Sequence, residues 1–350
     1  MSKSIKLLLI LAIFLFLWFT FDILAQTWWS EHIDFGVASK YGSFIGGFFS
    51  FITVLLIYFT LKHQSDSFNT TAFENKFFQL ISYHRSNIEN WIYRTPDSKS
   101  EQREKGQRVF IKIHREILYA AEELIPFLSN NKIEDLLNRQ EIQKLNNNKV
   151  IEERGIDKLE LQRFNIAYLI VLFGVGKEGR RVLERFLLRK YGNQFVTNIL
   201  DYFQSIPAKW DNDKARIEKN LHYKYFGGHQ HRLGHYFRNL YQAVNYVNDY
   251  TAFHRNYKLK YNYIKTYRAQ FSTYEQSVFF FNSLSDIGQT WELGAEVSEI
   301  NKMLITKYNL IKNIPAEFIL DVDLGKFYPD VEYEGEKKTK HKQELEKKYT

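Results

Sequence analysis

The feature that most constrains this chain is a pair of apolar stretches near its N-terminus. The first, residues 5–25, carries charge only near its ends, at Lys6 and Asp22, and the second is Tyr41–Leu61. Each is long enough to cross the roughly 30 Å of a bilayer's hydrocarbon as a helix rising about 1.5 Å per residue. A secretory signal peptide is the rival interpretation, but the first stretch exceeds the usual apolar length and no small-x-small cleavage site follows it. We therefore predict a two-helix transmembrane hairpin over residues 1–63.

The flanking charges predict how this hairpin is oriented. Basic residues stand next to both termini of the hairpin, at Lys3, Lys6 and Lys62, whereas the connecting loop holds Glu31 and Asp34 against one lysine. Loops rich in Lys and Arg stay in the cytoplasm. We therefore expect two spans with both chain termini in the cytoplasm and the loop outside.

Small residues recur along one face of the second apolar stretch. Gly42, Gly46 and Ser50 follow one another at four-residue spacing, with Gly47 nearby. Small residues at this spacing let two helix backbones approach closely in a membrane. This face is a candidate for membrane helix packing, either on the first span of the same hairpin or on further copies of the chain.

The rest of the chain predicts an all-α soluble domain. From residue 64 to about residue 330, apolar residues recur every three to four positions, and alternating strand-like runs are scarce. A stretch rich in Asn, Glu and Lys at residues 130–157 has weak periodicity and is expected to be a loose insertion. The lysine-rich residues 331–350 are expected to form a basic disordered tail.

Composition excludes several kinds of chemistry. The chain has no cysteine, which rules out disulfide frameworks, thiolate metal sites and cysteine nucleophiles. Its 48 Lys and Arg exceed its 40 Asp and Glu, giving a net charge of +8 that is compatible with anionic partners without selecting one.

A polar stripe marks the helix predicted over about residues 232–249. The members of this stripe follow at i, i+4, i+7 and i+11 beside an apolar stripe: His231, His235, Arg238 and Gln242. It is either a solvated face or a binding or switch surface. His229, His231 and His235 could in principle hold zinc, but no acidic residue accompanies them in this run, so we expect no metal and no cofactor.

A second candidate group repeats every seven residues. Arg268, Glu275 and Asn282 would share one face of a single helix, among several phenylalanines. A buried Glu275 needs a partner, and Arg238 or Arg268 would supply the cation. The group is either a structural ion pair that fixes helix register or a binding or switch site, and an active-site carboxylate at Glu275 is a further alternative.

A nuclease-like spacing also occurs. Arg216 and His222 are separated by five residues, which resembles the Arg-x(4–6)-His motif of HEPN-type ribonucleases. Such a pair could act on a phosphodiester and its developing charge, although a chain with ten histidines is expected to contain chance matches.

Four segments together resemble the phage abortive infection proteins of the AbiC-like type. Besides the two apolar stretches, they are FENKFFQLISYHRSNI from Phe73, AYLIVLFGVG from Ala167, GHQHRLGHYFRNLYQAVNYV from Gly228 and RAQFSTYEQSVFFFNSLSDIG from Arg268. The resemblance implies a bacterial antiphage effector of the inner membrane that arrests or kills the infected cell. It carries over no catalytic residues.

The resemblance and the hairpin together favour a toxin that permeabilises the membrane once its cytosolic domain is released. The expected partners are the lipid bilayer, further copies of the chain and a regulatory component from the same operon. That component would be an antitoxin-like protein or, in a retron-type system, a reverse transcriptase with its RNA–DNA product. A membrane-tethered ribonuclease using Arg216 and His222, and a non-catalytic sensor or scaffold, are the alternatives.

Overall fold

The computed structural model describes residues 10–11, 13–22, 25, 35–94, 103–129, 131–206, 224–253, 256–294, 303–315, 317–319 and 322–335. The chain divides into two compact units, Met1–Lys76 and Phe77–Thr350, and helix α2, Phe35–Glu89, contributes to both. The Arg216 and His222 pair and the tail from residue 336 onward lie outside the described residues.

The first unit contains a short apolar helix, Ile13–Asp22, and the N-terminal part of α2. The two helices are in contact through aromatic rings, with centroids 5.7 Å apart for Phe16 and Phe49 and 5.5 Å apart for Phe19 and Phe44. A strip of large side chains along α2 is half-buried at three- to four-residue spacing: Ile45, Phe48, Ile52, Leu55, Leu56 and Phe59. The packing of this helix pair therefore uses bulky side chains.

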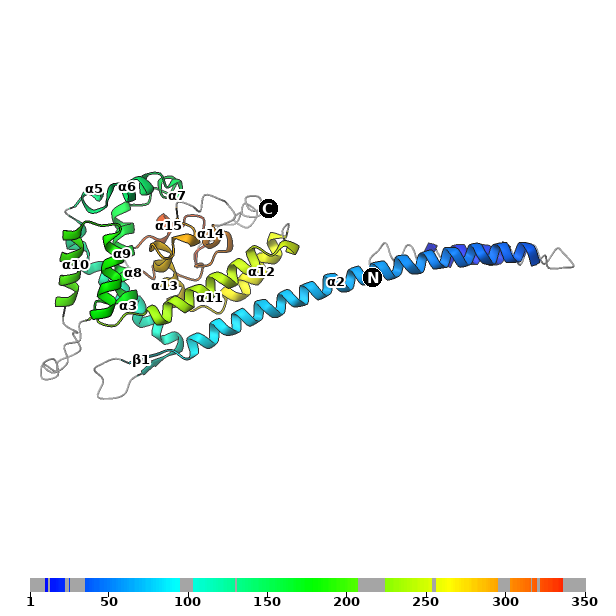
Figure 1. Ribbon diagram of the computed structural model, residues 1–350, viewed down its shortest axis with the longest axis horizontal. Helices are drawn as coiled ribbons and strands as arrows, with labels where there is room; N and C mark the ends of the chain where they lie inside the picture. The colour runs from blue at the N-terminus through cyan, green and yellow to red at the C-terminus, as the bar shows by residue number, and fades with distance from the viewer. Residues whose placement is uncertain are drawn as a thin grey trace. The chain divides into compact units, whose positions relative to one another are not determined.

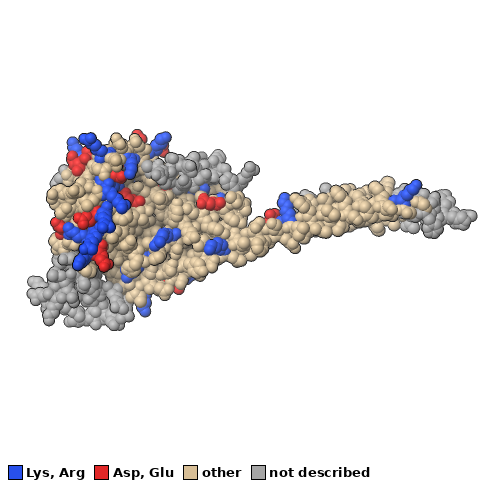
Figure 2. All heavy atoms as spheres, in the orientation of Figure 1, with Lys and Arg blue, Asp and Glu red and all other residues tan. Residues whose placement is uncertain are grey.

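α2 is long and apolar enough to cross a membrane. Its candidate segment, Gly42–Glu89, has a mean hydropathy of 2.2 over its most apolar window, and none of that window is buried in the protein. In Figure 2 the apolar part of α2 shows almost no charged side chains. The helix does not end near residue 61, because no glycine or proline interrupts it before Glu89.

The second unit is helical, as expected, with one small hairpin of strands β1, Ile92–Arg94, and β2, Arg103–Lys105. Its other elements in chain order are η1 (Gly106–Arg108), α3 (Val109–Glu123), α4 (Ile125–Leu128), α5 (Ile133–Leu136), α6 (Arg139–Asn146), α7 (Lys149–Glu153), α8 (Lys158–Phe173), α9 (Lys177–Leu188), α10 (Asn193–Ser205), α11 (Gln230–Asn248), η2 (Thr251–Phe253), α12 (Tyr257–Arg268), α13 (Thr273–Leu284), η3 (Gln289–Trp291), α14 (Leu304–Tyr308) and α15 (Leu324–Phe327). All-α is therefore the correct fold class.

The centre of this unit is formed by α3, α8 and α13, which pack on one another, with α11 and α12 running side by side next to them (Figure 1). α8 is apolar on all sides and buried along most of its length, as a helix at the middle of a fold must be. The side chain of Asp157 caps its first turn, and Gly174 ends it with φ +75°.

Glycines let the chain return closely to the end of α8. A Cβ on Gly228 would lie 2.3 Å from the carbonyl carbon of Phe173, so only glycine fits there. The amide of His229 then donates to the carbonyl of Val171 at 3.2 Å. This contact fixes the start of α11 against the end of α8, which positions the cavity described below.

Two sequence expectations for this unit were wrong. Residues 130–157 are not a loose insertion: they form α5, α6 and α7, with Leu136 and Ile151 buried and the Asn138 side chain capping α6. Their apolar residues are too few and too local to show helical periodicity. Likewise, Val331 and Tyr333 are buried in the body, so the disordered tail predicted from residue 331 does not begin there.

Candidate functional site

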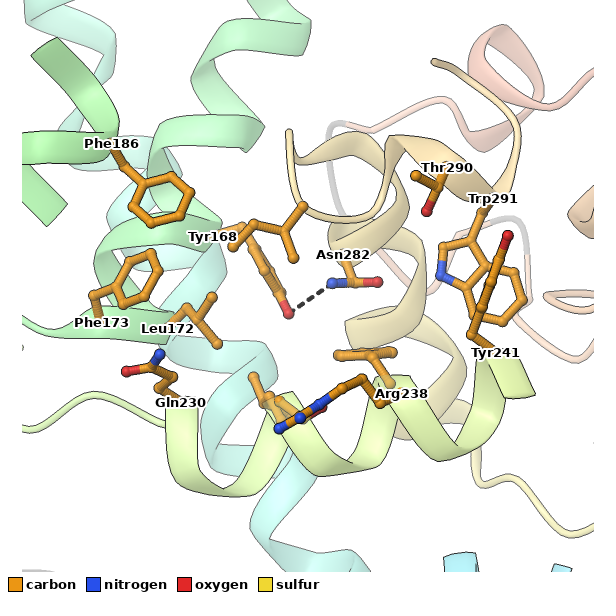
Figure 3. Close-up of a pocket in the computed structure, with 14 residues that line it drawn as sticks. Tyr168, Leu172, Phe173, Phe186, Gln230, Arg238, Tyr241, Asn282, Thr290 and Trp291 are labelled. Carbon is orange, nitrogen blue, oxygen red and sulfur yellow. Dashed lines mark hydrogen bonds between the residues drawn. The ribbon is translucent and has the colours of Figure 1, made fainter. Parts of the chain in front are cut away.

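A cavity of about 460 Å³ lies among α8, α9, α11, α13 and the turn that follows α13 (Figure 3). Its lining is mainly apolar and aromatic, and Arg238 and Asn282, two of the residues singled out from the sequence, belong to it. This volume falls in the range of small-molecule sites, which are mostly apolar with a few placed polar groups. The cavity is therefore the candidate functional site.

Two aromatic walls face each other across this cavity. On one side the rings of Phe173 and Phe186 pack with centroids 5.0 Å apart, and on the other Tyr241 and Trp291 pack edge to face at 4.9 Å. Figure 3 shows the two pairs at opposite ends of the pocket. The arrangement can receive a flat ring, because aromatic faces and edges stack favourably on one another.

The back of the cavity carries a polar pair. Asn282 on α13 donates from Nδ2 to the hydroxyl of Tyr168 on α8 at 2.8 Å, and Asn282 is only 2% exposed. Among the described residues, its Oδ1 has no hydrogen-bond partner. A buried oxygen without a hydrogen bond destabilises the folded protein by roughly 1–3 kcal/mol. A ligand that donates a hydrogen bond to this oxygen would remove that cost.

Gly288 brings the following turn close to this amide. A Cβ on Gly288 would lie 2.0 Å from the carbonyl oxygen of Asn282 and 2.7 Å from its Oδ1. Real side chains do not approach this closely, so a glycine at this position is what allows the turn to close the cavity over α13.

Arg238 supplies positive charge at the mouth of the cavity. Its Nε donates to the Gly234 carbonyl at 2.9 Å, and its guanidinium pairs with no carboxylate among the residues described. The predicted polar stripe does lie on the outer side of α11, since His231, His235, Arg238 and Gln242 are all exposed. Of these four, Arg238 alone lines the cavity, while His231 borders a separate hollow beside Gly227 and Gly228.

A second hollow adjoins the cavity and shares Phe186 and Thr290 with it. There Lys190 forms an ion pair with Asp286 at 2.7 Å, whereas the Arg189 guanidinium lies over the Phe186 ring, 5.3 Å from its centroid. Arg189 also ends a row of exposed basic residues along α9 that includes Lys177, Arg181 and Arg185. Figure 2 shows basic side chains gathered in a band on this side of the molecule.

Arg268 and Glu275 are not on one helix and do not pair. α12 ends at Arg268, and α13 begins after Ser272, whose hydroxyl accepts from the Glu275 amide at 3.2 Å. In return, the Ser272 amide donates to the Glu275 carboxylate at 2.8 Å, which completes a capping box. The Ser-x-x-Glu pattern of a capping box is present in the sequence and correctly predicts a helix start at this point. The seven-residue repeat of Arg268, Glu275 and Asn282 therefore crosses a helix boundary.

Arg268 instead donates from Nη1 to the carbonyls of Tyr308 and Asn309, each at 2.8 Å. Glu275 is fully buried, and no cation contacts it in the described part of the chain. Burial raises the pKa of its carboxyl from 4.5 to about 7, while hydrogen bonds from Ser272 and Tyr236 act in the opposite direction. The predicted ion pair of Glu275 with Arg238 or Arg268 is therefore wrong.

His229 has an acidic partner that its own segment does not contain. Its Nε2 lies 2.8 Å from a Glu116 oxygen of α3, and Nδ1 lies 3.2 Å from the Arg232 guanidinium. Because arginine only donates, Nδ1 accepts and Nε2 donates, which leaves no lone pair for a metal ion. Within the described residues, no group of three His, Asp or Glu side chains could hold a metal.

The small-residue face of α2 is open. A Cβ added to Gly42, Gly46 or Gly47 would meet nothing within 4 Å. Among the described residues, the glycines therefore do not pack on the Ile13–Asp22 helix, which uses the strip of large side chains instead.

The residues missed by sequence reasoning are those that reach the cavity from distant elements. Tyr168 and Phe186 belong to helices α8 and α9, and Trp291 to the turn after α13. Tyr168 lies 114 positions from the asparagine it contacts, so no local spacing could have indicated it. The AYLIVLFGVG segment, which contains Tyr168, was noted only as part of the family resemblance, which assigns the tyrosine no role.

A family model matches the part of the chain that contributes α11, α13 and the turn after α13 to the cavity. Residues 228–319, which contain α11 to α14, match the model of a family described as "Putative phage abortive infection protein". The match confirms the resemblance for two of the four sequence segments, those that begin at Gly228 and Arg268. No curated protein and no solved structure matches the chain.

Proposed function

We propose that this protein, which carries the abortive infection segment at residues 228–319, is a membrane-anchored effector that arrests or kills a phage-infected bacterium. In this proposal, the Ile13–Asp22 helix and α2 form a hairpin in the inner membrane, and the second unit is cytoplasmic. Release of the second unit lets several hairpins associate through Gly42, Gly46 and Ser50 and permeabilise the membrane.

The observation that carries this proposal is the open glycine face. A single hairpin buries its bulky strip and leaves Gly42 and Gly46 with free space beside them. In a membrane, close backbone packing through small residues drives helix association. The face is therefore available to another copy of the chain without any rearrangement of the hairpin itself.

The orientation rests on the loop charges, with both termini in the cytoplasm. A cytoplasmic second unit can meet a phage-derived signal or be restrained by a regulatory partner encoded in the same operon. A reverse transcriptase with its RNA–DNA product, as in a retron-type system, or an antitoxin-like component would serve this role.

The experiment is to replace Gly42 and Gly46 by isoleucine and to follow membrane potential and cell survival after induction. Because both positions face open space, isoleucine fits the isolated hairpin and obstructs only a second helix. Phe51→Ile is the control: it places the same residue at an exposed position about 180° around the helix from Gly42. We expect the double variant to lose toxicity and the control to retain it.

Equal killing by the double variant and the parent would refute association through this face. A fragment Phe77–Thr350, which keeps the turns of α2 that belong to the second unit, tests the anchor separately. If this fragment alone protects cells from phage, the membrane has no part in the mechanism.

A membrane-tethered ribonuclease is the alternative proposal, supported by the five-residue spacing of Arg216 and His222. Replacing His222 by alanine should then abolish RNA cleavage after infection, and unchanged protection by this variant would eliminate it. A non-catalytic scaffold differs from both, since it would be harmless when expressed without its operon.

A further inference from the structure

The cavity has the shape of a site for a flat, two-ring ligand. Its walls are the aromatic pairs Phe173 with Phe186 and Tyr241 with Trp291, and its volume of about 460 Å³ suits one small molecule. Bases stack favourably on aromatic side chains. A ring system of this kind would bury its apolar faces against the aromatic lining.

The polar pair at the back of the cavity matches the edge of a nucleobase. Asn282 offers an unpaired acceptor at Oδ1, and the Tyr168 hydroxyl, which accepts from Asn282, keeps its own proton to donate. An adjoining acceptor and donor complement an amino group beside a ring nitrogen, as an asparagine amide does with adenine. Figure 3 shows the two groups meeting between the aromatic walls.

The positive charge of Arg238 at the mouth of the cavity favours an anionic group on the ligand. Arg238 lines the cavity and donates from Nε to the Gly234 carbonyl, so its two terminal nitrogens remain without a carboxylate partner among the described residues. Guanidinium groups bind phosphate through paired, charge-assisted hydrogen bonds. Arg189, in the adjoining hollow, adds a second positive charge on the same side.

We infer that this cavity binds a purine nucleotide, with the base between the aromatic walls and against Asn282 and Tyr168, and the phosphate at Arg238. The cavity lies within the second unit, and three of its elements belong to the abortive infection segment. A role of the nucleotide as the trigger that releases the hairpins rests on the proposed function. Binding of the nucleotide to the cavity does not depend on it.

The test measures binding to the purified full-length protein in detergent micelles by equilibrium dialysis. The probes are AMP and GMP, with adenosine and ribose 5-phosphate to separate the contributions of base and phosphate. Arg238→Gln should weaken AMP binding about tenfold, as expected for a lost hydrogen bond to a charged group, and leave adenosine binding unchanged. Arg181→Gln removes an exposed arginine of α9 that does not line the cavity, and it should bind AMP like the parent.

Asn282→Leu should weaken AMP and adenosine alike, because it removes the contact to the base. Since this side chain is buried, Phe186→Ala serves as a second variant: the ring is only half-buried, and its loss should also weaken both ligands. A 5′-phosphorylated dinucleotide distinguishes the two possible sources of the bound nucleotide. If it binds more tightly than AMP, the ligand is the end of a nucleic acid; if it binds more weakly, the ligand is a free nucleotide.

Absence of saturable binding by both AMP and GMP at millimolar concentration would overturn the inference. So would equal effects of Arg238→Gln and Arg181→Gln on AMP. The binding assay contains no membrane and no phage, so either failure leaves the permeabilisation proposal standing. Conversely, a Gly42 and Gly46 double variant that kills like the parent and still binds AMP would refute permeabilisation through this face and leave nucleotide binding standing.

Discussion

Two apolar helical segments of this protein, α8 and the Gly42–Leu61 part of α2, have opposite surroundings. In α8 nearly every side chain from Leu161 to Phe173 is buried, whereas in α2 Phe51 is 61% exposed and Val54 63% exposed. Both would score as apolar in a scan of the sequence. Their polar side chains show why one belongs in a protein core and the other does not.

Asn165, a buried polar residue of α8, finds its partners on other elements. Asn165 donates to Asp286 at 2.9 Å and to the Tyr191 hydroxyl at 3.1 Å, and its Oδ1 accepts from the Asp286 amide at 2.9 Å. A buried polar group must be satisfied in this way, because water cannot reach it. α8 therefore depends on the tertiary fold.

The polar groups of the α2 segment find partners within their own helix. The hydroxyls of Ser43, Thr53 and Thr60 each donate to the carbonyl four residues earlier, at 2.7–3.0 Å. A helix that satisfies all of its polar groups internally can stand in hydrocarbon without help from other elements. The two segments therefore differ in where their hydrogen-bond partners lie, on other elements for Asn165 of α8 and within the same helix for α2, although both are apolar by hydropathy.

A lysine introduced into each segment gives the largest expected effect. Ile170→Lys places a charge at a fully buried position of α8 and should cost more than about 4 kcal/mol, enough to abolish cooperative unfolding of the second unit. Val54→Lys, at an exposed position, should leave that unfolding unchanged and instead disfavour membrane insertion by about 3 kcal/mol.

Thermal melts in detergent and membrane fractionation measure these two outcomes separately. A variant Val54→Lys that melts earlier than the parent, or a variant Ile170→Lys that melts like it, would contradict the comparison.

The second prediction concerns pH. The second unit buries titratable groups, whereas Gly42–Leu61 contains no Asp, Glu, Lys, Arg or His. Because the pKa of Glu275 rises from 4.5 to about 7 on folding, its contribution to stability is present below pH 4.5 and is lost as the pH rises through about 7. The size is about 3 kcal/mol, at roughly 1.4 kcal/mol per unit of pKa.

Glu275→Gln, which resembles the protonated carboxyl, should therefore gain about 3 kcal/mol relative to the parent between pH 4.5 and pH 8. The buried imidazole of His84, whose pKa burial lowers to about 3, acts in the opposite direction but is common to both proteins. Denaturant unfolding at several pH values provides the measurement, and a difference that does not change with pH would mean that Glu275 stays ionised in the folded protein.

The smallest expected effect separates two glycines. Gly288→Ala should destabilise the second unit by about 2 kcal/mol, because its Cβ would lie 2.0 Å from the Asn282 carbonyl oxygen. Gly42→Ala faces open space inside a helix and should be neutral or stabilise α2 by less than about 1 kcal/mol. Melting temperatures of the two variants check this, and equal shifts would show that the turn after α13 can move aside.

The sequence by itself determined the helical class, the apolar segments and much of α11, because periodicity and hydropathy are local properties. It also carried the Ser272 and Glu275 capping signal, which the seven-residue repeat concealed. Only the tertiary structure decided that Arg238 and Asn282 line one cavity, and that His229 meets Glu116.

The physical reason is sequence separation. A cap or an amphipathic face is set by residues within a few positions, whereas Tyr168 and Asn282 meet across 114 positions because α8 and α13 pack in one core. The open face at Gly42 and Gly46 was also decided by the tertiary structure. The spacing of the glycines predicts that they share a face, but only the packing of the bulky neighbours shows that this face stays open.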